Sequence, residues 1–537
     1  MGKRIETKPK IVHKHVHKFY SNLYKSENVS DKDIEKYLET IKNPVLTDED
    51  ANSCEGDITE AELTLALNNM KLNKAPGIDG LTTEFYREFW PDIKELICKS
   101  INESFREGIL GYSQRKGVIT LIFKKGDREN LQNWRPITLL NIDYKLIATA
   151  LTNRLHNVIQ KLIDEDQVGY VKGRRGSDVA RLIQDVIDFA NSQPTDVEWC
   201  LFFVDFQKAF DTLEWNFILK CLRAYGFRED FIKWVSVLYK DIFNSVILNG
   251  WLTDNIQPSR GVRQGCPLSA LLFILAIEML AIKVRNADIV QGISIGNPHK
   301  VVKISQLADD LTLFMGNPKS AQTALQLIDE FGDKAGVRLN KSKTKAKWLG
   351  QRCPIDTVFN IPWEEHFVKS LGIYFSKHTK TSNELNWSDE RVLKIKRILD
   401  LWKSRYLTYK GKILILKTLI VSRLVYTAHV ILCPISVLTK IDKLMFDFLW
   451  GSPAVRVKRS YVTQDISTGG LNMIELKHHF NSIKIKWICR FIDDSQGKWK
   501  WFFEYWFEKI GGVQVNLNCR CDPKFILTNM QLLPTFY

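Results

Sequence analysis

The chain has 537 residues, 45% hydrophobic and 11% aromatic, which excludes a disordered chain and predicts two to four domains. A formal net charge of +15 favours a polyanionic partner, either a nucleic acid or a membrane surface. Charged residues interrupt every apolar stretch before about 18 residues, the N-terminus lacks an apolar signal core, and Glu6 breaks the myristoylation pattern. The sequence therefore predicts no membrane partner, and its ten scattered cysteines predict reduced thiols and an intracellular protein, in the cytoplasm, the nucleus or both.

Residues 1–57 are polar, and we expect them to be helical. Three alternating histidines there, His13, His15 and His17, suggest either a metal site or a solvated basic segment. We favour the basic segment because no cysteine or fourth ligand lies near. Residues 58–110 show helical spacing, interrupted by a Pro-Gly turn after which a new helix starts at Thr82 or Thr83.

A short strand is expected over residues 117–127, and a mixed helix and strand stretch over 167–211. Residues 305–315 predict a β-hairpin, and a helix follows over about 322–334. The pattern is helical from about residue 385 to 450, and the last ninety residues are rich in tryptophan.

Three aspartates stand out in these elements. Asp205 ends the apolar strand WCLFFVD, and Asp309 and Asp310 lie side by side at the tip of the hairpin SQLADDLTLFM. Adjacent like charges are costly unless a cation binds, and Mg²⁺ prefers carboxylate oxygen. A solvated Asp-Asp turn is the simpler reading, but it does not explain the Asp205 strand. Three acids on two neighbouring strand ends predict a two-metal site for phosphoryl transfer.

Eight ordered motifs resemble the reverse transcriptase of LINE-type non-LTR retrotransposons. They are NKAPGIDGLTTEFY, LIFKKGDRENLQNWRPITLL, DQVGYVKGRRGSDVARLIQDVI, FVDFQKAFDTLEW, GVRQGCPLSALLFILAIE, SQLADDLTLF, GVRLNKSKTK and VKSLGIYF. The likeness covers about residues 15–490. Leu307 replaces the usual aromatic residue before the Asp pair. The family's upstream endonuclease is not recognisable. Its C-terminal Cys-His knuckle is not recognisable either, because Cys519 and Cys521 stand too close together and no His follows them.

The resemblance implies an α+β right-hand polymerase with fingers, palm, helical thumb and a helical C-terminal appendage. The palm is expected to be a small antiparallel sheet with helices on one face. The expected boundaries are an N-terminal extension or linker at 1–57, fingers with part of the palm at 58–190, palm with a primer-grip hairpin at 191–384, thumb at 385–455 and a C-terminal helical region at 456–537.

It also implies roles for individual residues. Catalysis falls to Asp205, Asp309 and Asp310, which with Phe206 form the site for two Mg²⁺ ions, with Mn²⁺ as a possible substitute. The residues expected to bind the dNTP are Lys124, Arg135, Phe210, Gln264, Gly265 and Lys345. The Phe210 ring would collide with a 2′-OH and select deoxynucleotides, unless it is an ordinary core residue. For Asp211 we favour a helix cap over a supporting acid behind the site.

The nucleic-acid contacts implied are Arg263, Leu371, Gly372, Lys394, Lys396, Arg397 and Lys403. Between Arg391 and Lys417, nine basic residues meet one acid, Asp400, on an amphipathic helical pattern typical of a surface that tracks phosphates. A membrane-surface helix has the same pattern. The aromatic residues at 499–507 suggest a packed terminal helix, or less favourably a base-stacking surface.

The function implied is an RNA-directed DNA polymerase, a nucleotidyltransferase that extends a primer 3′-OH on an RNA template. Its partners are the RNA template, a DNA primer or target end, and dNTPs, with endonuclease activity supplied by another protein or a missing domain. The alternatives are an RNA-dependent RNA polymerase, which Phe210 argues against, an RNA-binding relic, which need not keep all three acids, and an endonuclease, for which no module is visible.

Overall fold

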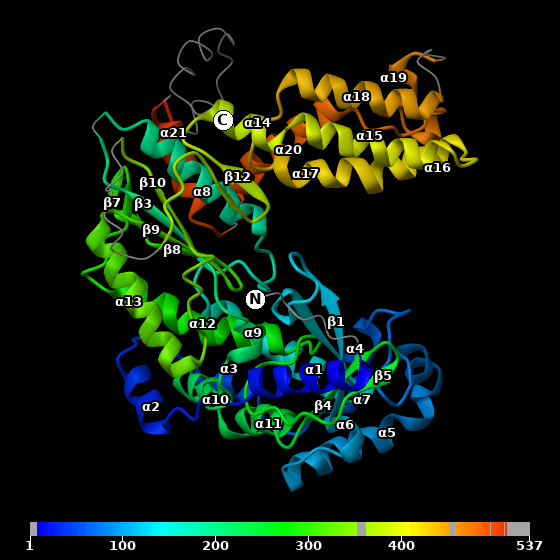
Figure 1. The fold of residues 1–537 in the computed structure, drawn as a ribbon, viewed down its shortest axis with the longest axis vertical. Coiled ribbons are helices and arrows are strands. Elements are labelled where there is room, and N and C mark those ends of the chain that lie inside the picture. Colours follow the sequence, from blue (N-terminus) through cyan, green and yellow to red (C-terminus); the bar gives the residue numbers. More distant parts are fainter. Residues whose placement is uncertain are drawn as a thin grey trace.

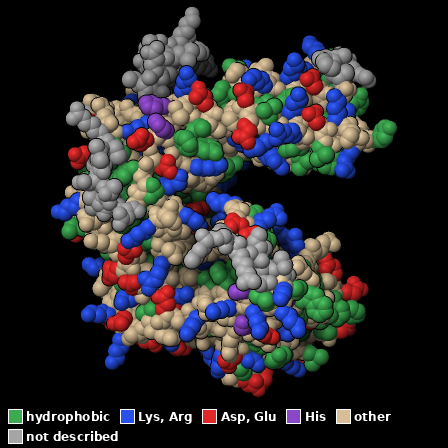
Figure 2. Space-filling view, in the orientation of Figure 1, with side chains coloured by type: hydrophobic (Ala, Val, Ile, Leu, Met, Phe, Trp, Pro, Cys, Tyr) green, Lys and Arg blue, Asp and Glu red, His purple; other side chains and the backbone are tan. Residues whose placement is uncertain are grey.

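The computed structural model describes residues 8–194, 196–351, 361–451, 457–493, 496–509 and 511–512. Figure 1 shows a large body of helices and two four-stranded sheets, from which a helical arm (α15–α18) extends. Figure 2 shows an open hollow between the arm and the lower part of the body. The α+β class predicted from the sequence is confirmed.

The catalytic candidates lie on an antiparallel sheet in the order β10 (Lys345–Trp348), β3 (Cys200–Val204), β9 (Asp310–Met315) and β8 (Ile304–Leu307). Successive side chains of β3 enter two different cores. Phe202 belongs to the first core, while Leu201 and Phe203 belong to the second. Because both faces are buried, β3 is a continuous apolar run. The expectation of helices on one face only is therefore wrong.

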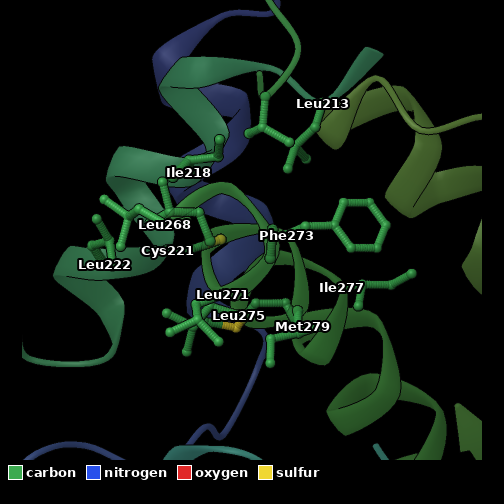
Figure 3. Close-up of a cluster of buried hydrophobic side chains, with 14 of the residues drawn as sticks. Leu213, Ile218, Cys221, Leu222, Leu268, Leu271, Phe273, Leu275, Ile277 and Met279 are labelled. Atoms are coloured by element: carbon green, nitrogen blue, oxygen red, sulfur yellow. The ribbon is translucent and has the colours of Figure 1, made fainter. Parts of the chain in front are cut away.

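Helices α10 (Trp215–Ala224), α12 (Ser269–Asn286) and α13 (Pro318–Ala335) supply side chains to the first core. Figure 3 shows part of this core, where Ile218 and Leu222 of α10 face Leu271 and Leu275 of α12. Helix α12 is apolar on nearly all sides because other elements surround it.

The first core continues into four further helices, α4 (Glu60–Asn69), α5 (Thr83–Glu107), α7 (Ile142–Leu162) and α11 (Glu229–Tyr239). Thr59 and Glu62 form a capping box on α4, and the Thr82 side chain caps α5, which confirms the predicted helix start. Beside these helices lies the second sheet, ordered β2 (Trp134–Leu139), β1 (Lys116–Phe123), β4 (Phe243–Leu248) and β5 (Trp251–Leu252).

The N-terminal segment is packed onto the body. Helix α1 (Pro9–Leu23) buries Val16 and Tyr20 against Val246 of β4, and α2 (Asp31–Glu39) adds its apolar face to the first core. A third short helix, α3, spans Asp48–Ser53. Among the described residues, no three His, Cys, Asp or Glu side chains lie close enough together to hold a metal ion.

The second core joins α8 (Gly176–Asn191) to the C-terminal helices α20 (Leu476–Ile492) and α21 (Trp499–Lys509). Trp499, Phe502, Phe503 and Trp506 of α21 are buried, which confirms the predicted packed helix. Arg490 of α20 donates two hydrogen bonds, of 2.9 and 2.8 Å, to the carboxylate of Asp178 in α8.

The arm contains α15 (Asp389–Lys403), α16 (Tyr409–Ile415), a π-helical turn at Leu416–Val421, α17 (Ser422–Ala428) and α18 (Ile435–Trp450). The basic segment from Arg391 to Lys417 is thus divided among α15, α16 and the start of the π-helical turn, with a break after Lys403. Ile395 and Leu399 are buried as expected, but Leu393 is 51% exposed, so the packed stripe is narrower than predicted.

The remaining elements are short. They are α6 (Tyr112–Arg115), a 3-10 turn at Leu131–Asn133, α9 (Ala209–Thr212), β6 (Ile293–Ile295), β7 (Asn297–Val302), the hairpin strands β11 (Val368–Ser370) and β12 (Ile373–Phe375), α14 (Thr379–Asn386), α19 (Arg459–Val462) and a 3-10 turn at Ile466–Thr468.

Within the ranges given above, no helix is long and apolar enough to cross a bilayer. The seven cysteines described there are free thiols, as predicted, whereas Cys519 and Cys521 lie outside the described residues.

Candidate active site

Strand register brings the three aspartates to one end of the first sheet. Val204 pairs with Leu311, so Asp205, which follows Val204, stands beside Asp310 at the start of β9. Leu307 pairs with Asp310 across a two-residue turn that contains Ala308 and Asp309. Ala308 has a φ of +57°, the left-handed conformation that such a tight turn requires. The predicted hairpin is confirmed.

The negative charges of the aspartates at this end of the sheet repel one another. Burial raises the pKa of Asp309, with a further contribution from Asp205. Burial and the charges of Asp309 and Asp205 raise the pKa of Asp310 to about 6. Lys124 offsets part of this effect at both carboxyls. A bound cation would relieve the remaining repulsion, so the donor set fits a hard divalent ion.

The aspartates do not form a closed metal cage. In the part of the chain that the structure describes, no three acidic, His or Cys side chains are close enough to enclose an ion by themselves. An ion at this end of the sheet would therefore need further oxygen ligands from water or a substrate phosphate.

Gln167 braces the turn that carries the Asp pair. Its side chain is fully buried, and its Oε1 accepts hydrogen bonds of 2.8 Å from the main-chain N–H groups of both Ala308 and Gly169. Its Nε2 donates to Gln306 Oε1 at 3.0 Å. The motif DQVGY pointed to this segment, but nothing in the sequence assigned Gln167 this role.

The aspartates open into a cleft of about 1230 Å³. Its lining includes Asp205 and Asp309 and most of the predicted nucleotide contacts, namely Lys124, Arg135, Phe210, Gln264 and Gly265. Phe210 is half-buried and stacks on Phe273 of α12, with ring centroids 4.2 Å apart. It is therefore anchored in the core on one side and lines the cleft on the other.

Two predicted residues are placed differently from expectation. Lys345 forms an ion pair with Glu364 and does not line the cleft, whereas Lys343, two residues earlier, does. Arg263 also borders the cleft but is only 4% exposed, and its guanidinium donates to Arg115 O at 2.5 Å. Arg263 thus supports the loop from within, and the expected contact with nucleic acid is not available to it in this structure.

Lys208 and Tyr170 line the same cleft and were not predicted. Lys208 Nζ donates to Trp134 O at 2.8 Å, which ties α9 to the second sheet. The backbone of Tyr170 is left-handed, with φ of +59°. Burial, and to a smaller extent the charge of Asp309, raises the pKa of Tyr170. Two further cations beside Asp205, Lys208 and Lys343, make this mouth of the cleft more basic than the motifs suggested.

The favoured interpretation of Asp211 as a helix cap is wrong. It lies inside α9, and its buried carboxylate accepts a 2.9 Å hydrogen bond from Gln264 Nε2. The alternative, an acid that supports the site from behind, agrees with this geometry.

The hairpin β11–β12 and the arm contribute the remaining candidates. Leu371 and Gly372 form the hairpin tip, both with positive φ. Lys396, Arg397 and Lys403 are exposed on α15, whereas Lys394 pairs with Glu390 at 2.7 Å. Burial and the charge of Asp310 raise the pKa of Tyr426 in α17 to about 12.

Comparisons with known proteins agree with this site. Residues 122–375, which include all three aspartates, match the family described as reverse transcriptase (RNA-dependent DNA polymerase). The chain is 28% identical over 543 residues to the transposon TX1 uncharacterized 149 kDa protein of Xenopus laevis, a match that covers 98% of this chain and 40% of that protein.

It is also 25% identical over 462 residues to the retrovirus-related Pol polyprotein from the type-2 retrotransposable element R2DM of Drosophila melanogaster, covering 81% of this chain and 42% of that protein. A shorter match, 26% identical over 155 residues and covering 28% of this chain and 17% of the relative, joins it to a probable RNA-directed DNA polymerase from transposon BS of Drosophila melanogaster. The chain thus spans about two fifths of the length of the first two relatives. Residues 122–375 thus match a reverse transcriptase domain, and the relatives that match along most of the chain are proteins of transposons and retrotransposable elements.

Proposed function

We propose that this chain is an RNA-directed DNA polymerase that extends the 3′-OH of a primer on an RNA template. The observation that carries the proposal is the meeting of Asp205, Asp309 and Asp310 at one end of the sheet, where Asp205 and Asp309 line a cleft that also contains Lys124 and Arg135. Carboxylates beside cations suit a reaction in which a triphosphate is positioned and its leaving group neutralised.

The proposed cofactor is a pair of Mg²⁺ ions, for which Mn²⁺ can substitute. Asp205, Asp309 and Asp310 would hold the ions, and Phe206 would contribute through its main chain, because its buried ring offers no ligand atom. When bound, the ions supply an acidified primer hydroxyl and a stabilised pyrophosphate leaving group.

The protein's own residues would bind and select the nucleotide. Lys124, Arg135 and Lys343 are the cations suited to the triphosphate. Gln264 and Gly265 would lie against the base pair. Phe210, held by its stack on Phe273, would exclude a ribose 2′-OH by contact.

The nucleic acid would follow the hollow between the arm and the body. In this assignment residues 58–190 are fingers with part of the palm, 191–384 palm, and 385–455 thumb, with an N-terminal extension or linker at 1–57 and a C-terminal helical region at 456–537. Lys396, Arg397 and Lys403 would contact phosphates, and the tip at Leu371 and Gly372 would hold the primer. The primer or target end would come from an endonuclease in another protein or in a domain beyond these residues, and the site of action would be the cytoplasm or the nucleus.

A primer-extension assay tests the proposal. The purified chain, a DNA primer annealed to RNA and labelled dNTPs should give extended DNA in the presence of Mg²⁺ and none in EDTA. Extension with rNTPs at an equal or higher rate would favour an RNA polymerase instead. Binding without extension of any kind would leave only an RNA-binding protein.

A further inference from the structure

The N-terminal segment reaches the back of the proposed nucleotide site through Tyr24, the residue that ends α1. Tyr24 is buried, and its side chain lies close to the carboxyl of Asp211, whose charge adds to the effect of burial in raising the pKa of Tyr24. Asp211 in turn accepts the 2.9 Å hydrogen bond from Gln264 Nε2. A chain of side-chain contacts thus runs from the N-terminal segment to a residue of the cleft.

The backbone near Tyr24 is joined to the loop that leads to Gln264. Tyr24 O accepts hydrogen bonds from the main-chain N–H groups of Ser259 at 2.9 Å and Arg260 at 3.2 Å. Arg260 Nε donates to Leu23 O at 3.0 Å, and Arg260 also pairs with Glu27 at 3.0 Å. The segment is therefore fixed next to the loop on both its main-chain and side-chain sides.

The loop and α9 are pressed together at Gly261. A Cβ built on Gly261 would lie 2.5 Å from Asp211 O, and the φ of this glycine is +83°. Such close approach leaves little freedom for Asp211 to move away from the loop. Burial raises the pKa of Asp211 to about 6, and Lys208, Gln264 and Tyr24 counter that rise, so the carboxylate is ionised at pH 7 to 8.

The bond to Asp211 fixes the Gln264 amide. An amide has two N–H donors and one carbonyl acceptor, and one donor is committed to Asp211. The orientation of the other donor and of the carbonyl follows from that commitment, so both are presented to the cleft in one arrangement.

We propose that Asp211 is a positioning residue that holds the Gln264 amide for the incoming nucleotide, and that Tyr24 of the N-terminal segment holds Asp211. The inference rests on the proposed polymerase function. It makes the N-terminal segment part of nucleotide binding, although no residue of that segment needs to touch the base.

Tyr20 offers a matched control one turn earlier in α1. Its ring lies 6.0 Å from that of Tyr24, and its buried hydroxyl has no hydrogen-bond partner among the described residues. Tyr24→Phe and Tyr20→Phe both remove one buried hydroxyl from neighbouring rings of the same helix, but only the first breaks the contact with Asp211.

Single-nucleotide extension by the full chain, with kcat and KM for the correct dNTP, provides the test. Tyr24→Phe should raise KM about three- to tenfold, with kcat within about twofold, because a polar group beside a buried carboxylate is lost. Tyr20→Phe should leave both constants within about twofold. Asp211→Asn should raise KM less than Asp211→Ala, because an amide oxygen can still accept from Gln264.

A double-mutant cycle separates positioning from a general structural effect. In a Gln264→Ala background, Tyr24→Phe should add less than about twofold to KM, since the group it positions is gone. Independent, multiplying effects would overturn the inference, as would equal effects of Tyr24→Phe and Tyr20→Phe or of Asp211→Asn and Asp211→Ala. Absence of extension by the unaltered chain would instead refute the polymerase proposal itself.

Discussion

Val204 and Leu311 are partners across β3 and β9, and Asp205 and Asp310 are the next residues of the two strands at the same end. They owe their proximity to that register. A slip of one residue would turn Asp205 to the opposite face of the sheet. Because the side chains of β3 alternate between two separate cores, such a slip would also exchange the contents of both. The register of the active site is thus fixed by packing on both faces.

Asp309→Asn and Asp205→Asn should each lower primer extension by about a thousandfold or more, because the amide keeps the shape but removes the charge that holds the metal. Asp92→Asn, an exposed site on α5, is the control and should retain full activity. Near-normal extension by either active-site variant would refute the metal assignment.

Asp310 should make the metal-free protein pH-sensitive. Its folded pKa of about 6 exceeds an unfolded value of about 3.9, so the folded state binds more protons between these pH values. Its contribution to stability is fully present below pH 4 and is lost as the pH rises through 6. In EDTA at pH 7.5, Asp310→Asn should therefore raise Tm by about 1–3 °C.

Two further measurements check this origin. The gain in Tm should largely disappear at pH 3, where Asp310 is mostly protonated in both states. Mg²⁺ should raise the Tm of the unaltered chain more than that of the variant. A variant that is less stable than the parent at pH 7.5 would show that the Asp310 carboxylate stabilises the fold instead.

Gln167→Ala should lower activity about 10- to 100-fold, because the turn that presents the Asp pair loses its bracing acceptor. Gln160→Ala is the comparison, since Gln160 is exposed and donates only to Lys172 O. The apparent Mg²⁺ requirement should rise with Gln167→Ala. If extension and metal requirement match those of Gln160→Ala, the turn does not depend on Gln167.

Sequence patterns predicted the positions of some residues in these predictions but not the roles of others. The hairpin, the start of α5 and the strand ending at Asp205 follow from local signals, namely alternation, a capping threonine and an apolar run. Gln167 and Asp211 act on residues that are distant in sequence or held by a loop, so their partners appear only after packing.

The position of Lys343, rather than Lys345, at the cleft has a related cause. Alternation along the sequence predicts which face a side chain points to only within a strand. Because β10 begins at Lys345, Lys343 belongs to the preceding turn and faces the cleft. The break after Lys403 was likewise hidden, because the basic composition continues from α15 into α16.

Phe210→Val should raise the ratio of rNTP to dNTP incorporation, because removal of the ring opens space for a 2′-OH. Use of dNTPs should largely persist, since Phe273 continues to fill the core behind it. Competition between matched rNTP and dNTP measures the ratio, and Phe273→Leu serves as the control for a packing defect. An unchanged ratio would assign Phe210 to the core alone.

Removal of charge at Lys396, Arg397 and Lys403 should weaken primer–template binding equally for all sequences. The slope of log affinity against log salt should fall in magnitude by about 2–3, because about 0.7–0.9 counterions are released per phosphate contact. Lys394 should contribute less, since Glu390 already neutralises it. Lys32, Lys36 and Lys42, exposed in and after α2, form the control set. A loss confined to some template sequences would indicate base readout by α15.

The packing of α21 also bears on how the protein is made. Leu201 and Phe203 of the catalytic strand share the second core with Trp499 and Phe502, roughly 300 residues further along the chain. Translation at about 5–20 residues per second puts about 15–60 s between the synthesis of the two. During that interval the second core lacks the side chains of α21, so its apolar residues are less completely covered than in the finished protein.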